Sequence, residues 1–257
     1  FVVFFHIPDT PHGAWFLSER EKALVVERIR VNQQGFGNRY FKKYQFLEAL
    51  KDYKTWLIFL FSLISNIPNG GTTNFGSILL KEDFGYSTLD SLLMGMPGGA
   101  VELVGCTLLS IVSQTKFIKS RMAIAVFSGV VSVTSQCMLA FAPLKKARLA
   151  GYILISVGPV GFICMLSLVA LNVAGHTKKV TTNAILLIGY CIGNIIGPQT
   201  FIDHQAPQYR GAKLAIVICG SISLVIIILI WIAYIWENSK KEKLRAEHAG
   251  EELGHNQ

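Results

Sequence analysis

The stretch WLIFLFSLISNIPNGGTTNFGSILL, residues 56–80, decides the fold of this chain. Both of its ends are apolar, and a helix needs about 20 apolar residues to cross a lipid bilayer. Its middle, SNIPNGGTTNFG at 65–76, instead carries asparagines, glycines and a proline. A broken helix at membrane depth is tolerated only where it is buried in protein or lines a cavity. The stretch therefore predicts an unwound membrane helix beside a pathway through the bilayer.

The composition extends this prediction to the whole chain of 257 residues, of which 51% are hydrophobic and 16% charged, with a mean hydropathy of +0.45. This bias excludes an ordinary soluble domain. The sequence predicts an all-α membrane protein with six transmembrane helices, and the apolar runs lie at about 56–80, 89–113, 122–142, 149–174, 183–201 and 214–236.

The chain divides by composition into four segments. FVVFF at the start looks like the end of a preceding transmembrane helix rather than a signal peptide, because no basic region precedes it and no small-residue cleavage site follows. We therefore expect the sequence to begin inside a larger protein. The expected segments are the end of that helix at 1–5, a cytoplasmic central loop at 6–55, a six-helix transmembrane half-bundle at 56–236 and a cytoplasmic tail at 237–257.

Within the central loop, Ser18 and Glu21 form the sequence pattern of a capping box, which predicts an amphipathic helix over about 19–33. Such a helix either braces two halves of a transporter or merely connects them through solvent. The sequence alone does not separate these alternatives.

The net charge of +8 is explained by membrane topology. Nine of the 24 Lys and Arg residues lie in residues 6–55, and four lie in the tail after residue 236. Basic residues gather on the cytoplasmic side of membrane proteins, so both ends of this segment are expected to be cytoplasmic. We expect no nucleic-acid partner.

The cysteines fall one in each of five spans, and no Cys or His spacing suggests a metal or redox site. Small apolar side chains that fill helix interfaces account for all five. We expect no cofactor and no metal. The cysteines are Cys106, Cys137, Cys164, Cys191 and Cys219.

Glycines recur every four residues in two spans, which places them on one helix face where a neighbouring backbone can approach. The packing of helices that also slide past one another would use the same spacing. The residues expected in packing or gating are Gly70, Gly71, Gly95, Gly99, Gly189, Gly193, Gly197 and Pro198.

Uncharged polar residues inside the spans are candidates for contact with a substrate. Asn69 and Asn74 flank the Gly-Gly pair, and an unwound segment would turn both toward a cavity. Hydrogen bonding between helices is the alternative for both. Tyr190 and Asn194 are four residues apart and share a helix face, and Gln199 follows on the same span.

Glu102 is the one charged residue far from every span end, thirteen residues after its span starts and eleven before it stops. A carboxylate there costs about 2.5–3.5 kcal/mol on insertion scales. Such a residue is a candidate for proton coupling. The alternative is a protonated glutamic acid that bonds to a neighbouring helix.

Several stretches resemble one family closely. The segments IPDTPHGAWFLSEREKALVVERIR, NIPNGGTTNFGSILLKEDFGYSTLDSLLMGMPGGAVELVG, NVAGHTKKVTTNAILLIGYCIGNIIGPQTF and APQYRGAKLA resemble fungal members of the major facilitator superfamily, in its anion:cation symporter branch of allantoate-permease-like proteins. The resemblance covers nearly the whole chain and implies spans 7–12 of a twelve-helix fold, that is, its C-terminal half.

The resemblance implies a secondary active transporter of the plasma membrane that takes up a small organic anion, such as allantoate or a vitamin carboxylate, with protons and by alternating access. The partners it implies are the anion, protons, the bilayer and a missing N-terminal six-helix half. This half supplies no deeply placed Arg or Lys, so a cation for a carboxylate substrate is expected from the other half. A membrane receptor or scaffold, or a non-functional fragment, is the alternative. No arrangement of nucleophile and base suggests an enzyme.

Overall fold

The computed structural model describes residues 13–31, 40–112 and 120–255, with side chains described as far as residue 243 except at 29–31. Helices, and no strands, make up the regular structure of these residues. The predicted helix end at 1–5 lies outside them. The elements are α2 (Glu19–Val31), α3 (Lys43–Lys51), α4 (Tyr53–Glu82), α5 (Thr88–Leu93), α6 (Met96–Val112), α7 (Arg121–Phe141), α8 (Lys145–Leu154), η2 (Ile155–Val157), α9 (Pro159–Asn172), α10 (His176–Gln199), η3 (Asp203–Gln205) and α11 (Arg210–His255).

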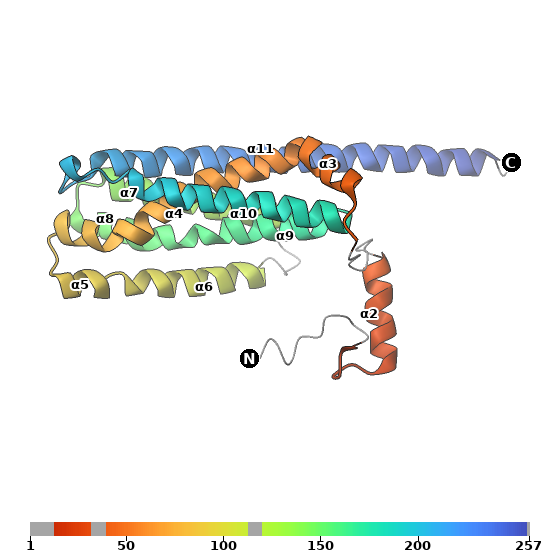
Figure 1. The fold of residues 1–257 in the computed structure, drawn as a ribbon, viewed down its shortest axis with the longest axis horizontal. Coiled ribbons are helices and arrows are strands. Elements are labelled where there is room, and N and C mark those ends of the chain that lie inside the picture. The colour runs from red at the N-terminus through yellow and green to blue at the C-terminus, as the bar shows by residue number, and fades with distance from the viewer. Residues whose placement is uncertain (1–12, 32–39, 113–119, 256–257) are drawn as a thin grey trace.

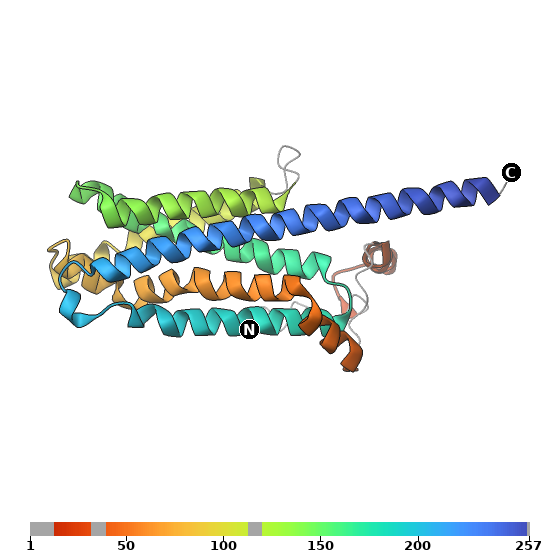
Figure 2. The ribbon, with the colours of Figure 1, turned by 90° about the horizontal axis from the view of Figure 1, so that it is seen from above.

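The long helices form a bundle along a common axis (Figures 1 and 2). The segment α8–η2–α9 makes one passage through this bundle, and α5 with α6 makes another. Successive passages run in opposite directions, so the chain enters at the start of α4 and leaves at the same end along α11. Among the described residues, this arrangement is the six-helix half of a twelve-helix fold, as the sequence predicts.

Five of these passages are long and apolar enough to cross a membrane by length and composition, among the residues that the structure describes. They are Thr88–Val112, Arg121–Phe141, Lys145–Asn172, His176–Gln199 and Arg210–Lys243. The helix α4 spans 30 residues but is not among the five. Its asparagines, glycines and threonines lower its hydropathy, and α4 instead packs against α10 and α11 inside the bundle.

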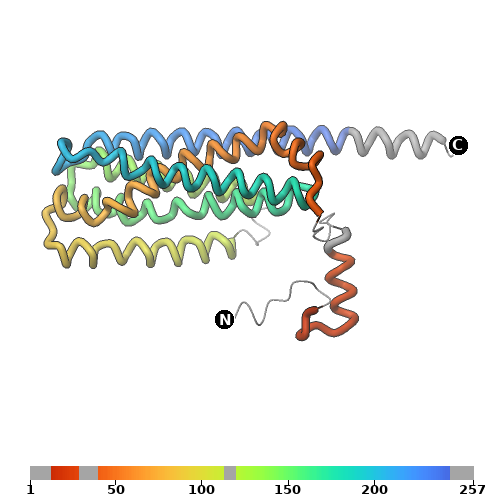
Figure 3. Tube along the Cα trace, in the orientation of Figure 1, coloured from red at the N-terminus to blue at the C-terminus, as the bar shows by residue number. Residues whose placement is uncertain are grey.

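The prediction that α4 unwinds at 65–76 is wrong. The helix continues through Pro68, Gly70 and Gly71 from Tyr53 to Glu82 (Figure 3). Proline removes one backbone N–H and crowds the preceding turn, and glycine lowers helix propensity. Membrane helices tolerate both where neighbouring helices and polar side chains compensate.

Polar side chains on α4 find their partners in the helix itself, because they donate to backbone carbonyls one turn back. The Asn66 amide donates to the Ser62 carbonyl at 2.7 Å, the Thr72 hydroxyl to Pro68 at 2.9 Å and the Asn74 amide to Gly70 at 2.8 Å. The polar residues that suggested a break are therefore satisfied within a continuous helix.

The connection before α4 carries two helices. The capping box predicted at the start of α2 is present, because the Ser18 N–H donates to Glu21 at 2.9 Å and the Glu21 N–H donates to Ser18 at 3.4 Å. The Ser18 N–H and the Ser18 hydroxyl both donate to the Glu21 carboxylate, and these two bonds, the backbone one above all, lower the pKa of Glu21. Figure 1 shows α2 away from the bundle. The helix α3, which the sequence analysis did not predict, packs on α10 instead.

Two apolar clusters hold the bundle together. One contains Phe61, Met165, Leu186, Ile227 and other residues of α4, α7, α9, α10 and α11. The other lies near the end of α4 and the start of α11. There the Tyr209 hydroxyl donates to Glu82 at 2.8 Å, which raises the pKa of Tyr209.

Candidate functional site

A cavity of about 580 Å³ lies within the half-bundle, and every one of its six passages contributes to the wall. Most lining side chains are polar and uncharged, and among the described lining residues Glu102 is the one acidic or basic residue. Apolar side chains of the first cluster, Phe61 and Ile227, border it as well. The polar lining residues are Ser65, Asn66, Asn69, Thr72, Thr73, Asn74, Glu102, Ser128, Ser132, Gln136, Tyr152, Ser156, Tyr190, Asn194 and Ser223.

The α4 and α10 walls meet at a pair of asparagines. The Asn69 amide on α4 donates to the Asn194 side-chain oxygen on α10 at 3.1 Å, and Asn194 donates to the Tyr190 carbonyl at 2.9 Å. Both residues line the cavity. The Asn69 side chain therefore bonds between helices and also lies where a solute in the cavity could contact it.

Tyr190 and Gln199 differ in position although both lie on α10. Tyr190 lines the cavity, with its ring 5.5 Å from that of Phe162. Gln199 is exposed and is not a lining residue, and its amide donates to the Ile195 carbonyl at 3.1 Å. Five residues separate Gln199 from Asn194, which turns it by about 140° around the helix. That rotation takes it away from the cavity face.

Glu102 lies on α6 and lines the cavity. It is exposed in this half, and among the described residues no hydrogen bond or ion pair to it is found. Its carboxylate is therefore accessible to groups from outside the described residues.

The glycines on α10 meet α4 at very close range. A Cβ at Gly189 would lie 2.8 Å from the Phe59 carbonyl oxygen, and one at Gly193 would overlap the Leu63 carbonyl oxygen. Backbone atoms of α4 also crowd Gly197. On the facing helix, a Cβ at Gly70 would lie 2.7 Å from the Asn194 Cα, and one at Gly71 would lie 2.9 Å from the Phe201 ring. These glycines therefore allow two backbones to touch. Pro198 comes directly after this contact, inside α10, and is half-buried.

The glycines near the start of α6 serve a different purpose. Gly95 and Gly99 line the cavity, and a Cβ at Gly99 would meet no atom of the described residues within 4 Å. The close approach occurs at Gly98, where a Cβ would lie 2.9 Å from the Ser156 hydroxyl. The four-residue spacing of Gly95 and Gly99 therefore marks the cavity wall in this structure, not a helix contact.

Sequence reasoning missed the contribution of α7 to the cavity. Ser128, Ser132 and Gln136 are four residues apart and line it from one helix face. The Gln136 amide donates to the Ser132 hydroxyl at 3.2 Å, while its oxygen is buried without a hydrogen-bond partner among the described residues. This polar stripe in an apolar span was visible in the sequence as a repeat of four.

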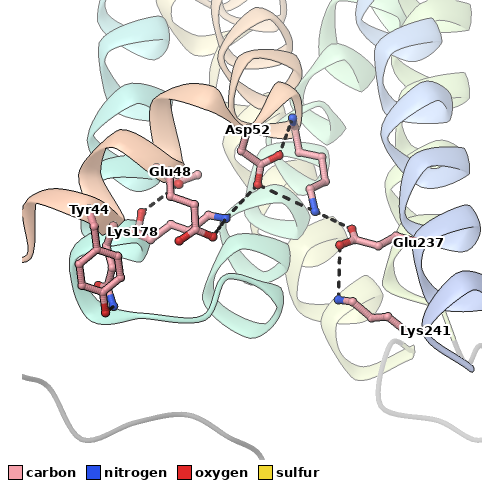
Figure 4. A network of polar contacts seen from close by, with 9 residues as sticks. Tyr44, Glu48, Asp52, Lys178, Glu237 and Lys241 are labelled. Carbon is pink, nitrogen blue, oxygen red and sulfur yellow. Dashed lines mark hydrogen bonds and ion pairs between the residues drawn. The ribbon is translucent and has the colours of Figure 1, made fainter. Parts of the chain in front are cut away.

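Charged residues join the helices at the end where α4 begins (Figure 4). Lys178 on α10 bonds to Asp52 at 3.1 Å and to Glu48 on α3 at 2.8 Å. Lys54 on α4 bonds to Glu237 on α11 at 2.5 Å. The starts of α4 and α10 and the far part of α11 are thereby linked, together with α3.

Comparison with known proteins identifies the family to which this chain is similar. The profile of the Major Facilitator Superfamily matches residues 1–198. The chain is 51% identical over 253 residues to the allantoate permease of Saccharomyces cerevisiae, which covers 96% of this chain and 47% of the permease. An uncharacterized transporter of Schizosaccharomyces pombe is 44% identical over 247 residues, covering 96% of this chain and 48% of that protein.

A thiamine pathway transporter of Saccharomyces cerevisiae is 32% identical over 260 residues, covering 98% of this chain and 47% of that protein. The chain thus spans about half the length of the curated relatives that it matches. Its apolar helices and its relatives make it an integral membrane protein of a transporter family. The chain belongs to the Major Facilitator Superfamily, and it corresponds to the C-terminal half of such a transporter.

Proposed function

We propose that this chain forms the C-terminal wall of a proton-coupled importer that takes up a small organic anion by alternating access. The observation that carries the proposal is the polar cavity with Glu102 on its wall. Amides and hydroxyls suit a polar solute, and a carboxylate exposed to that space suits a proton carrier. A second six-helix half would close the cavity from the opposite side, as in transporters built from two repeats.

The substrate class follows from the relatives and from the charges of the wall. A relative that is 51% identical is named allantoate permease, which supports a small carboxylate as substrate. Among the described lining residues there is no Lys or Arg, so the N-terminal half would supply the cation that pairs with the carboxylate. We also propose that the transporter lies in the plasma membrane, where an importer would act. Both ends of this segment would be cytoplasmic, which the nine basic residues in 6–55 support.

A chimeric transporter tests the proposal. In this chimera, residues 1–257 replace the matching C-terminal half of the yeast allantoate permease, and it is expressed in cells that lack that permease. We expect labelled allantoate to accumulate in cells with the chimera. Cells with residues 1–257 alone are expected to show no uptake, because one half encloses no site.

Matched cells with the intact yeast permease provide the positive control, and surface labelling measures the amount of each protein in the membrane. A chimera that reaches the surface but accumulates none of a panel of small carboxylates would contradict the proposed function. Robust uptake by the chain alone would contradict the need for a second half.

A further inference from the structure

A second pocket, of about 490 Å³, lies at the opposite end of the bundle from the network of Figure 4, where α4 ends and α8 and α11 begin. We call it the basic end pocket. Its wall includes Asp83, Arg148, Arg210 and Lys213, and also the apolar residues Phe141 and Leu214. All of these residues belong to this half.

The charges of this pocket do not balance. Asp83 accepts from Lys213 at 2.7 Å and from one nitrogen of Arg148 at 3.0 and 3.1 Å. The side chains of Asp83 and Lys213 are only 4% and 6% exposed. Arg210 adds a third cation; it is exposed, and its Nε donates to the neutral Gln208 at 2.8 Å. The described wall of the pocket thus carries one carboxylate and three cations.

Arg148 has hydrogen-bonding capacity that Asp83 does not use. Its Nη1 makes both contacts with Asp83, while its Nε is buried and has no hydrogen-bond partner among the described residues. The Phe84 ring, 5.2 Å from the guanidinium carbon, fixes the plane of the group. A planar guanidinium presents paired donors that match an oxyanion such as a carboxylate.

The geometry points to an anion-binding site in the basic end pocket, which captures the carboxylate of the transported anion before it enters the central cavity. This inference rests on the proposed function for the identity of the anion and for the outward position of this end of the bundle. Excess positive charge near a cavity raises the local concentration of an anion and its rate of association. Anionic lipids concentrate in the cytoplasmic leaflet, at the other end, which favours a dissolved carboxylate over a lipid phosphate.

Two substitutions in the chimera test this site, and a third serves as their control. Arg210→Gln removes an exposed cation that has no charged partner among the described residues, and Arg148→Lys keeps the charge beside Asp83 but removes the planar donors. Lys146→Gln removes a cation from an exposed residue of α8 at the same end but outside the pocket. We expect both pocket variants to raise the KM for allantoate uptake roughly three- to fivefold with little change in maximal rate. The control variant should keep the KM of the unsubstituted chimera.

A binding measurement separates this inference from the proposed function. Sodium acetate, compared with sodium chloride at equal ionic strength, should raise the melting temperature of the purified chimera, and Arg210→Gln should reduce that shift while Lys146→Gln should not. This result would support the pocket even in a chimera that transports nothing. An unchanged KM or an equal melting shift in Arg210→Gln would overturn the inference. Stabilisation by vesicles containing phosphatidylglycerol, without stabilisation by acetate, would overturn it in favour of a lipid.

Discussion

Glu102→Gln in the chimera is expected to abolish concentrative uptake of allantoate while leaving exchange of substrate across the membrane intact. Glutamine keeps the shape and hydrogen-bonding capacity of the side chain but cannot carry a proton from one side to the other. Glu102 faces the cavity, and none of the described residues bonds to it. A proton that moves down a pH difference of one unit supplies about 1.4 kcal/mol, or tenfold in concentration. The accumulation ratio should therefore fall about tenfold or more, toward one.

Accumulation is measured at acidic and neutral external pH, and exchange is measured in cells that were loaded with unlabelled substrate. Glu242→Gln is the matched control, because Glu242 is an exposed glutamate on α11 far from the cavity. Concentrative uptake equal to that of the unsubstituted chimera at both pH values would reject coupling through Glu102. Glu102 would then serve only as a hydrogen-bonding group between helices.

Substitutions at Gly193 are expected to have the other large effect. A Cβ at Gly193 would overlap the Leu63 carbonyl oxygen and lie 2.9 Å from the Asn66 Cβ, so even alanine must push α10 away from α4. Overpacking of this kind costs about 1–3 kcal/mol. Gly193→Ala should lower both the melting temperature and the uptake, and Gly193→Leu should remove uptake altogether. If transport also requires α4 and α10 to slide past each other, the loss of uptake should exceed what the loss of stability alone predicts.

Gly105→Ala is the matched control for this series. Gly105 lies inside α6, and a Cβ there would meet the Val157 side chain at an ordinary 3.9 Å. Alanine also favours the helix over glycine by up to about 1 kcal/mol. Gly105→Ala should therefore match or exceed the stability of the unsubstituted chimera. If Gly193→Ala behaves like Gly105→Ala, α4 and α10 do not approach as closely in the membrane as in this structure.

The sequence alone predicts the six-helix arrangement because that arrangement depends on long apolar runs and on helix periodicity. It also predicts that Asn69, Asn74, Tyr190, Asn194 and Glu102 lie in spans, and the structure brings all five to one cavity. The continuity of α4 was not predictable from propensity. Tertiary packing against α10, which the glycines of both helices allow, accompanies the continuous helix and overrides the low helix propensity of proline and glycine.

Other errors have equally local causes. Gln199 was grouped with Asn194 by proximity in the sequence, but five residues rotate it off the cavity face. The α7 stripe of Ser128, Ser132 and Gln136 went unnoticed because small polar residues barely lower the hydropathy of a span. The basic end pocket is lined by residues near the end of α4 and near the starts of α8 and α11. Sequence patterns do not show which distant segments lie side by side in the fold.

The most direct measurement of the central claim, that the cavity is the path of the substrate, is the protection of single cysteines in the chimera. The five native cysteines of this chain and those of the other half are replaced, and Thr73→Cys and Gln199→Cys are made separately. Thr73 lines the cavity, whereas Gln199 is exposed outside it. We expect allantoate to slow the modification of Thr73→Cys by a thiol reagent and to leave that of Gln199→Cys unchanged. Equal modification rates of Thr73→Cys with and without allantoate, in a variant that still transports it, would contradict the claim.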